Sequence, residues 1–143
     1  MNVRLACSND QAEIASLTEE LGYAVSRHSL TKNLSAILQS GDHLLLVAES
    51  DDKSIVGWIH VFKAVRVESE TFAEIGGFVV HGPMRGQGIG LGLLNEAESW
   101  VRSQGIQKLR VRTRSQRARA RSFYQRSGFF CTKEQVVFDK SIV

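Results

Sequence analysis

Residues 79–90 read Val79-Val80-His81-Gly82-Pro83-Met84-Arg85-Gly86-Gln87-Gly88-Ile89-Gly90, and they lie between a predicted strand and a predicted helix. The apolar run 72–80 indicates the strand, and apolar residues at helical spacing from about 90 to 104 indicate the helix. A helix N-terminus offers unpaired N–H groups and the positive end of the helix dipole, and glycines let the backbone approach an anion closely. We therefore predict that the main chain of residues 85–90 binds a diphosphate, with Arg85 as an additional charged donor.

The spacing of these glycines excludes two common nucleotide-binding motifs. A P-loop requires a second glycine five residues after the first, followed by Lys and Ser or Thr, but Gln87 stands five residues after Gly82. The dinucleotide fingerprint G-x-G-x-x-G fails as well, because residues 86–90 read G-x-G-x-G. The pattern that remains, R-G-x-G-x-G after a strand, is specific.

The rest of the chain alternates between helical and strand patterns. Further helices are predicted from the N-cap candidates Ser8-Asn9-Asp10 to Gly22, from Ser29 to Ser40-Gly41, and from Ala118 to Ser127. Further strands are predicted at 3–6, 43–49, 55–62, 108–113 and between Phe129 and the C-terminus, where Val136-Val137-Phe138 is the clearest part. We expect a single mixed α/β domain over residues 1–143, with a central sheet of about six to seven strands flanked by four helices. Gly76-Gly77 predicts a bulge in the strand before the loop, or a close approach of another backbone.

Composition narrows the class of protein. The 143 residues are 43% hydrophobic and 23% charged, which is ordinary for a globular domain. The longest apolar run, 44–48, is far shorter than a membrane span, and residues 1–10 lack the pattern of a signal peptide. Cys7 and Cys131 show no metal-ligand spacing, so we predict no metal site and expect two reduced thiols in a cytoplasmic protein.

The net charge of +3 is unevenly distributed. The segment 108–126 contains eight Lys or Arg and no acidic residue, which leaves ten basic residues and all 15 acidic ones in the remainder. Such a segment favours an anionic partner. One interpretation is that these arginines lie on solvated strand and helix faces, and the other is that Arg117 and Arg121 bind a phosphate group of a ligand or an acidic substrate.

Two motifs give the chain a resemblance to the GNAT acetyltransferase family. Arg85-Gly86-Gln87-Gly88-Ile89-Gly90 matches the family's acetyl-CoA loop, Q/R-x-x-G-x-G/A, at every defined position. Residues 120–129, Ala-Arg-Ser-Phe-Tyr-Gln-Arg-Ser-Gly-Phe, resemble the family's A-x-x-F-Y-x-x-x-G-F segment. Many members carry Asn seven residues before the tyrosine, where it contacts the pantetheine arm, and this chain has Arg117 there.

The resemblance implies the cofactor site. It predicts that acetyl-CoA, as a co-substrate, is bound by the loop residues Arg85, Gly86, Gln87, Gly88, Ile89 and Gly90 and by Arg117. It also implies that the strand before the loop diverges from the next strand and holds pantetheine in the wedge. Phe78 and Val80 would then offer backbone groups to pantetheine, with Val79 between them.

The resemblance also implies catalytic residues for acetyl transfer to an amine. Tyr124 matches the family's general acid, and a phenol of pKa about 10 stays protonated at neutral pH and can protonate a departing thiolate. An attacking amine must lose a proton, and Glu74 lies on the strand where family members often place a carboxylate that acts through water. His81 and His60 are alternatives for the base.

The leading functional prediction is an N-acetyltransferase that modifies a primary amine of a small molecule or of a protein. The region 23–38 resembles the family's variable acceptor side, and its basic residues Arg27, His28 and Lys32 weakly indicate an anionic acceptor. One alternative is a non-catalytic acyl-CoA sensor. A nucleic-acid-binding module that uses the basic segment 108–126 is disfavoured, because only Phe123 and Tyr124 could stack on bases. Membrane association is not expected, and a homodimer is possible by resemblance.

Overall fold

A computed structural model describes residues 1–114 and 117–143. The chain divides into two compact units, Met1–Arg112 and Thr113–Val143. The single domain expected over residues 1–143 stays a prediction.

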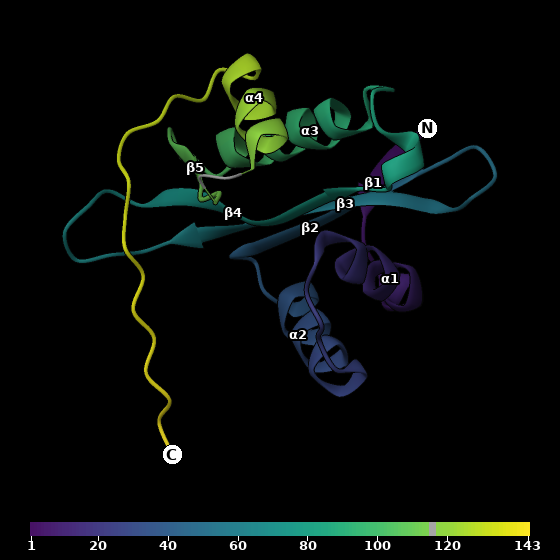
Figure 1. Cartoon of the computed structure of the whole chain (residues 1–143), viewed down its shortest axis with the longest axis horizontal. Helices are drawn as coiled ribbons and strands as arrows, with labels where there is room; N and C mark the ends of the chain where they lie inside the picture. Colours follow the sequence, from purple (N-terminus) through teal and green to yellow (C-terminus); the bar gives the residue numbers. More distant parts are fainter. Residues whose placement is uncertain (115–116) are drawn as a thin grey trace. The chain divides into compact units, whose positions relative to one another are not determined.

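The first unit is built around one five-stranded sheet in the order β1-β2-β3-β4-β5 (Figure 1). Its strands are β1 (Asn2–Leu5), β2 (His43–Glu49), β3 (Ile55–Ala64), β4 (Phe72–Val80) and β5 (Leu109–Val111). The first four strands pair in antiparallel fashion, and β4 pairs with β5 in parallel. The parallel pair requires a crossover, and α3 (Ile89–Ser103) supplies it, as the sequence predicts.

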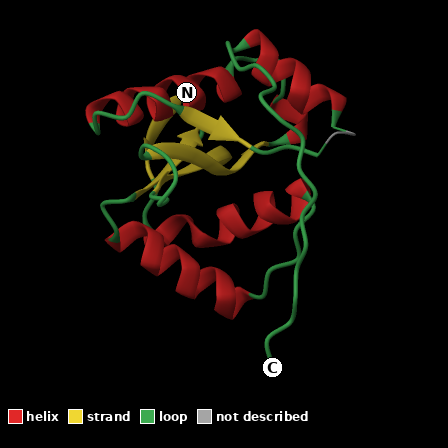
Figure 2. Ribbon diagram, turned by 90° about the vertical axis from the view of Figure 1, so that its left-hand side faces the viewer, coloured by secondary structure: helices red, strands yellow, loops and turns green. Residues whose placement is uncertain are grey.

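Helices cover both faces of this sheet (Figure 2). Two helices, α1 (Gln11–Leu21) and α2 (Arg27–Gln39), lie on the face opposite α3 (Figure 1). Ser26 caps the N-terminus of α2 by accepting a hydrogen bond from the N–H of Ser29 at 3.1 Å, so this helix begins earlier than predicted. The α1 and α2 face of the core includes Ile14, Leu17, Leu34, Leu45, Val47 and Trp58. The opposite face of the sheet is covered by Leu93, Leu94 and Ala97 of α3, which are fully buried.

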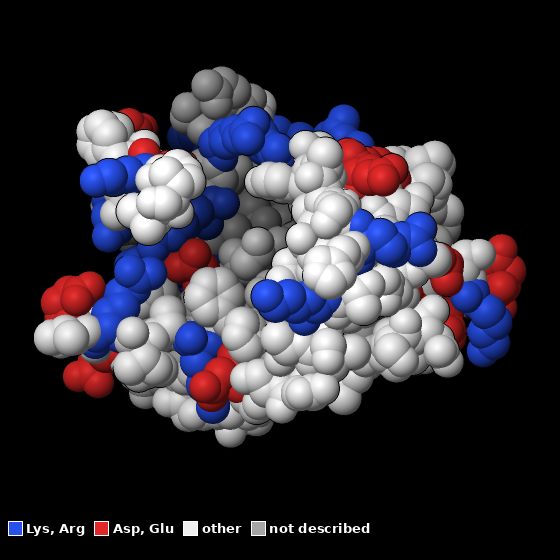
Figure 3. Space-filling model, turned by 90° about the horizontal axis from the view of Figure 1, so that it is seen from below, with Lys and Arg blue, Asp and Glu red and all other residues white. Residues whose placement is uncertain are grey.

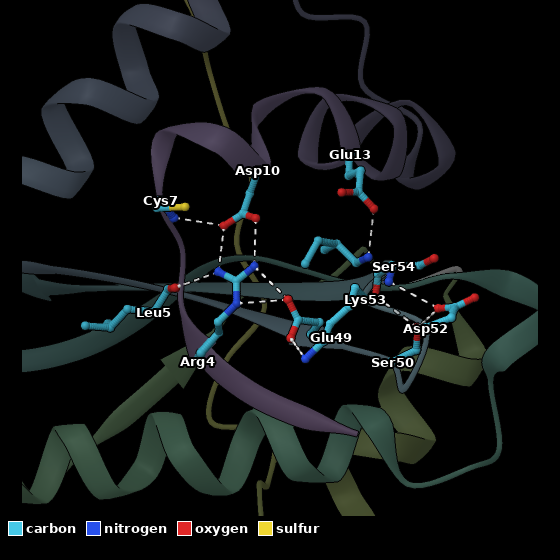
Figure 4. Close-up of polar contacts among 11 residues, drawn as sticks. Arg4, Leu5, Cys7, Asp10, Glu13, Glu49, Ser50, Asp52, Lys53 and Ser54 are labelled. Carbon is cyan, nitrogen blue, oxygen red and sulfur yellow. Dashed lines mark hydrogen bonds and ion pairs between the residues drawn. The ribbon is translucent and has the colours of Figure 1, made fainter.

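A buried ion-pair network fixes the start of α1 against the sheet (Figure 4). Asp10 is 4% exposed, and Arg4 of β1 donates to its two carboxylate oxygens at 2.9 Å each. Arg4 also donates to Glu49 of β2 at 3.2 and 3.3 Å. The hydrogen bond from Arg4 holds the pKa of Asp10 below its usual value, so this carboxylate is ionised at neutral pH. One turn further, Glu13 accepts a hydrogen bond from the backbone N–H of Ile55 at 2.8 Å.

The predicted irregularity at Gly76-Gly77 is confirmed as a bulge in β4. His60 pairs with Gly77 and the next β3 residue pairs with Ile75, so Gly76 is the extra residue. The absence of side chains here has a packing reason. A Cβ on Gly77 would lie 2.5 Å from the Trp58 ring, and one on Gly76 would lie 2.7 Å from the His60 ring.

The second unit contains one helix, α4 (Ala118–Arg126), within its described residues. The helix ends at Gly128, whose φ of 93° is left-handed, and the N–H of Phe129 bonds back to the carbonyl of Tyr124 at 2.9 Å. This turn brings Phe129 onto Tyr124 in an edge-to-face contact with ring centroids 5.4 Å apart. The G-F end of the 120–129 motif is therefore a helix stop that folds one aromatic ring onto another.

The fold confirms the mixed α/β class and four α-helices in the described part of the chain, but the number of strands is five and not six to seven. The error lies at the C-terminus, since residues 129–143 form no strand. The apolar residues that predicted it are exposed, with Val136 and Val137 at 79% and Phe138 at 90%. Both Cys7 and Cys131 are free thiols, and both are exposed. Within the described residues, no helix is long and apolar enough to span a bilayer.

Candidate active site

The loop before α3 contains two glycines in an unusual backbone conformation. Gly86 and Gly88 have φ values of 81° and 84°, in the left-handed region that favours glycine. Gly88 is the N-cap residue of α3, and no side chain of the described residues caps this helix. The first intrahelical bond runs from Gly92 N–H to Gly88 C=O at 3.0 Å, so the N–H groups before Gly92 have no intrahelical acceptor. A Cβ built on Gly86 or Gly88 would meet no atom within 4 Å, so the loop is open on that side.

This open helix N-terminus is suited to an anion. The N–H groups of the first turn and the positive end of the dipole of a 15-residue helix both favour a negatively charged ligand. Two left-handed glycines place the backbone within reach of a ligand without Cβ atoms in the way. The loop residues 85–88 are exposed, whereas Ile89 is 4% exposed and anchors the first turn in the core. Of the predicted cofactor residues of the loop, Arg85 to Gly88 therefore form one continuous, accessible segment.

The backbone of β4 presents polar groups at the edge that faces β5. The N–H of His81 donates to the carbonyl of Val56 on β3 at 2.8 Å. Since successive residues of an antiparallel strand alternate in direction, Val79 also faces β3, and Phe78 and Val80 direct their backbone groups to the opposite edge. Among the described residues, β5 pairs with β4 from Ala73 to Ile75, and this pairing does not extend to Phe78–Val80. The wedge for pantetheine that the family resemblance implies stays a prediction.

The entrance of the loop is held by a residue that the sequence analysis missed. Glu20 of α1 accepts a hydrogen bond from the backbone N–H of Gly82, and its other oxygen lies 2.8 Å from Nδ1 of His81. The hydrogen bonds from His81 and Gly82 lower the pKa of Glu20, so it is a carboxylate at neutral pH. In the sequence, Glu20 is one of several charged residues on a helix face, and no local signal distinguishes it.

Glu74, the predicted base, is a buried carboxylate with two arginine neighbours. It is 8% exposed, and Arg112 donates to its Oε2 at 3.1 Å. Its Oε1 lies 3.8 Å from a guanidinium nitrogen of Arg66 and accepts no hydrogen bond among the described residues. A buried carboxylate oxygen of this kind can take a hydrogen bond from a water molecule or an ammonium group.

His60, an alternative base, forms a pair with His43 across β2 and β3. The rings are stacked with centroids 5.1 Å apart, and Nδ1 of His43 lies 2.9 Å from Nε2 of His60. Burial, reinforced by His43, lowers the pKa of His60 to about 4, so its imidazole is neutral at physiological pH. His60 and Trp58 also line a small cavity of about 80 Å³ between the sheet and the first two helices. The third candidate, His81, is engaged by Glu20.

Tyr124 and Arg117 both lie in the second unit. Tyr124 is half-buried on α4, with its ring against Phe123 and Phe129. Burial raises the pKa of Tyr124 to about 12, and the nearby charge of Arg117 acts in the opposite direction. The phenol is therefore a proton donor over the whole physiological range. Arg117 is the N-cap residue of α4 and contributes no side-chain cap.

The basic segment 108–126 does not behave as one surface feature. Lys108 and Arg110 lie over the ring of Phe72 with cation-to-centroid distances of 4.9 and 4.4 Å, and Arg112 pairs with Glu74. Other arginines of the segment belong to α4, and residues 115–116 lie outside the described residues. On the face drawn in Figure 3, Lys and Arg side chains occur beside Asp and Glu. In the first unit the segment is thus partly occupied by internal cation–π and ion-pair contacts.

A mixed sheet with a parallel β4–β5 pair and a glycine loop that opens the crossover helix fit the acetyltransferase fold that the family resemblance implies. Residues 11–129 match the model of the acetyltransferase (GNAT) family. The chain belongs to the GNAT acetyltransferase family, which confirms the resemblance and the prediction of an acyltransferase enzyme.

Solved structures share the fold over essentially the whole chain. The apo aminoglycoside 6'-N-acetyltransferase AAC(6')-IG from Acinetobacter haemolyticus is 19% identical, with a TM-score of 0.88 and 100% of both chains covered. AAC(6')-Iy in complex with a CoA bisubstrate analogue of acetylneamine is 16% identical, with a TM-score of 0.88, 99% of this chain and 98% of that chain covered. A protein described as a transcriptional regulator from Bacillus halodurans C-125 is 24% identical, with a TM-score of 0.82, 97% of this chain and 99% of that chain covered. No curated protein matches the chain. At these identities the similarity shows the fold.

Proposed function

We propose that this protein transfers the acetyl group of acetyl-CoA to a primary amine. The observation that carries the proposal is the N-terminus of α3, which no side chain of the described residues caps and which follows two left-handed glycines. The loop 85–90 would hold the pyrophosphate through its backbone N–H groups, with Arg85 as a charged donor. Phe78 and Val80 would hydrogen-bond pantetheine, with Val79 between them. Arg117 is a cofactor contact that the family resemblance predicts. The solved relative with a bound CoA analogue supports the choice of cofactor.

Two residues of this chain would then carry out the two proton transfers of the reaction. Acetyl-CoA supplies the acetyl group as a thioester. Tyr124 would donate its Oη proton to the departing thiolate, and the raised pKa of Tyr124 keeps this proton in place at neutral pH. Glu74 is the proposed base, acting through water on the attacking amine, since its Oε1 accepts no hydrogen bond from the described residues.

We propose a small-molecule amine as the acceptor, with a peptide amine as the second choice. Two of the solved relatives are described as aminoglycoside 6'-N-acetyltransferases, so their acceptors are small molecules with several amino groups. In this chain, Arg27 and Lys32 lie on α2 in the predicted acceptor region. Basic side chains disfavour a polycation and favour an amine that also carries a carboxylate or a phosphate.

A binding measurement and an activity panel test the proposal together. Calorimetry with CoA should show saturable binding to the wild type, and Gly88→Asp should abolish it because it places negative charge against the pyrophosphate. Thiol release from acetyl-CoA is then followed with aminoglycosides, polyamines, amino acids and peptides. Retained binding by Gly88→Asp would overturn the loop assignment. Binding without turnover on any acceptor would instead favour the acyl-CoA sensor, a reading to which the relative described as a regulator lends some support.

We also propose that the chain forms a homodimer. The C-terminal segment exposes large apolar side chains, namely Phe130, Val136, Val137, Phe138, Ile142 and Val143. Exposed apolar clusters of this kind mark interaction surfaces in soluble proteins. Light scattering after size-exclusion chromatography should give twice the chain mass of 15.9 kDa, and a monomer at every concentration tested would contradict the proposal.

A further inference from the structure

We infer that Glu20 is a positioning residue for the cofactor loop: from α1 it holds His81 and Gly82 and thereby sets where the loop begins. The inference rests on the proposed function, because it assumes that residues 85–90 bind the pyrophosphate of CoA. It assigns a role in cofactor binding to a residue that is not itself expected to touch the cofactor.

The contacts of Glu20 are divided between a side chain and the main chain. One oxygen accepts a hydrogen bond from the backbone N–H of Gly82, and the other lies 2.8 Å from Nδ1 of His81. These are charge-assisted hydrogen bonds, which are the stronger kind. His81 directly follows β4, and Gly82 opens the short 3₁₀ turn Gly82–Met84 that leads to Arg85. Glu20 therefore fixes the chain at the point where it leaves the strand and enters the loop.

The helix that carries Glu20, α1, is held in place at its start and along one face. α1 is tied to the sheet at its start by Asp10, through Arg4, and by Glu13, which accepts from the N–H of Ile55. Ile14 and Leu17 of the same helix are buried in the core. A helix that is fixed at its beginning and packed along one face can hold its last turn in place. Glu20 in that last turn transmits this rigidity to the loop.

The charge of Glu20 makes the assignment specific. A carboxylate near a pyrophosphate site repels the ligand, so anion attraction cannot account for it. The guanidinium of Arg85 lies close by, since Glu20 Oε1 and Arg85 Nη1 are 3.1 and 3.8 Å from where a Cβ on Gly82 would lie. Arg85 offsets part of the repulsion. The position of Glu20 is therefore explained by its two hydrogen bonds, with Gly82 and with His81, and not by its charge.

Two substitutions separate geometry from charge. Glu20→Ala removes both hydrogen bonds and the charge. Glu20→Gln removes the charge, keeps one oxygen as an acceptor for the N–H of Gly82, and replaces the other oxygen by an NH2 group that can donate to Nδ1 of His81 in the tautomer that leaves this nitrogen unprotonated. Glu19→Ala is the matched control, because Glu19 is the exposed neighbour on α1 and its side chain forms no hydrogen bond or ion pair among the described residues. Each variant is measured for CoA affinity by calorimetry, for kcat and the KM of acetyl-CoA, and for thermal unfolding without ligand.

We expect Glu20→Ala to weaken CoA binding about tenfold, as the loss of charge-assisted hydrogen bonds at a partly exposed site should do. The KM of acetyl-CoA should rise in parallel, with kcat at saturation within about twofold of wild type. Glu20→Gln should remain within about threefold of wild-type affinity, and Glu19→Ala should be indistinguishable from wild type. The unfolding temperature checks that Glu20→Ala stays folded. If it does not, Glu20→Met carries the test, because it keeps the length of the side chain and removes both acceptors.

Two results would overturn the inference. Wild-type CoA affinity in Glu20→Ala would show that the loop does not need this contact, and equal losses in the Gln and Ala variants would show that charge matters and not geometry. Failure of the proposed function looks different, because the wild type itself would then not bind CoA.

Discussion

The conformation of the two loop glycines leads to a prediction with an internal control at the other end of the same helix. Gly88 precedes α3 with a φ of 84°, and Gly105 follows α3 with a φ of 72°. A Cβ built on either glycine meets no atom within 4 Å. Alanine at both positions therefore carries the same left-handed strain and no steric clash. The two positions differ only in that Gly88 lies in the proposed cofactor loop.

The expected magnitudes follow from this match. Left-handed backbone costs a non-glycine residue about 1 to 2 kcal/mol, so Gly88→Ala and Gly105→Ala should each lower the free energy of unfolding by about 1 kcal/mol or slightly more. In a chain of this length that corresponds to roughly 3 to 5 °C in Tm. CoA binding should separate the two variants. A methyl group at Gly88 displaces the ligand from at least one backbone N–H, which costs about 1.5 to 3 kcal/mol, or roughly tenfold to more than a hundredfold in Kd.

Calorimetry with CoA and differential scanning calorimetry test both parts on the same samples. The reasoning requires similar Tm shifts for the two variants, a much weaker Kd for Gly88→Ala, and a Kd within about twofold of wild type for Gly105→Ala. If both variants bind CoA as the wild type does, the loop does not contact the ligand through its backbone. If both lose affinity equally, the effect is one of helix stability and not of the loop.

Three further predictions concern catalysis, acid stability and the β4 bulge. Tyr124→Phe should lower kcat about a hundredfold or more with CoA affinity nearly unchanged, and an unchanged kcat in steady-state assays would contradict the acid role. Because burial raises the pKa of Tyr124 to about 12, titration of this phenol should not limit the wild-type rate below about pH 10. Asp10→Asn should cost about 2 kcal/mol at neutral pH, because it leaves Arg4 partly buried without its main partner. The pKa of Asp10 is lowered in the folded state, so its contribution to the free energy of unfolding is present above pH 3.8 and is lost as the pH falls through the lowered value. Urea unfolding from pH 7 to 2.5 should therefore show that the stability difference between wild type and Asp10→Asn shrinks as the pH falls, and a constant difference would contradict this. Gly77→Ala should cost about 1 to 3 kcal/mol by denaturant unfolding, because its Cβ would overlap the buried Trp58 ring, whereas Gly41→Ala, which meets nothing within 4 Å, should be neutral.

Features that are determined by residues close to one another in the sequence could be predicted. The glycine loop between β4 and α3 follows from the pattern of residues 79–90, and the bulge follows from the glycine pair in the middle of an apolar strand. The orientation of Phe78 and Val80 followed from the family resemblance, and the hydrogen-bond alternation of β4 now gives the physical reason. In each case the determining residues lie within a few positions of one another.

Features that depend on contacts between distant residues could not be predicted. Glu20 and His81 are 61 positions apart, and the pattern of α1 shows only that Glu20 is not on the apolar face. The same holds for Glu74, whose strand position was recognised but whose pairing with Arg112 and Arg66 was not. A charged residue on a helix or strand face is usually solvated, so its sequence gives no reason to expect a specific partner.

The missing C-terminal strand shows where strand patterns mislead. Val136, Val137 and Phe138 have the β-branched and aromatic side chains that favour strands, yet residues 129–143 pair with no strand. β-propensity measures how well a side chain fits a half-buried pleated surface, so it predicts a strand only if a partner edge is available. A single copy of the chain leaves these side chains exposed, at 79% to 90%. In the homodimer that we propose, a second copy could supply the partner edge, and a strand at residues 136–138 is then expected only in the dimer.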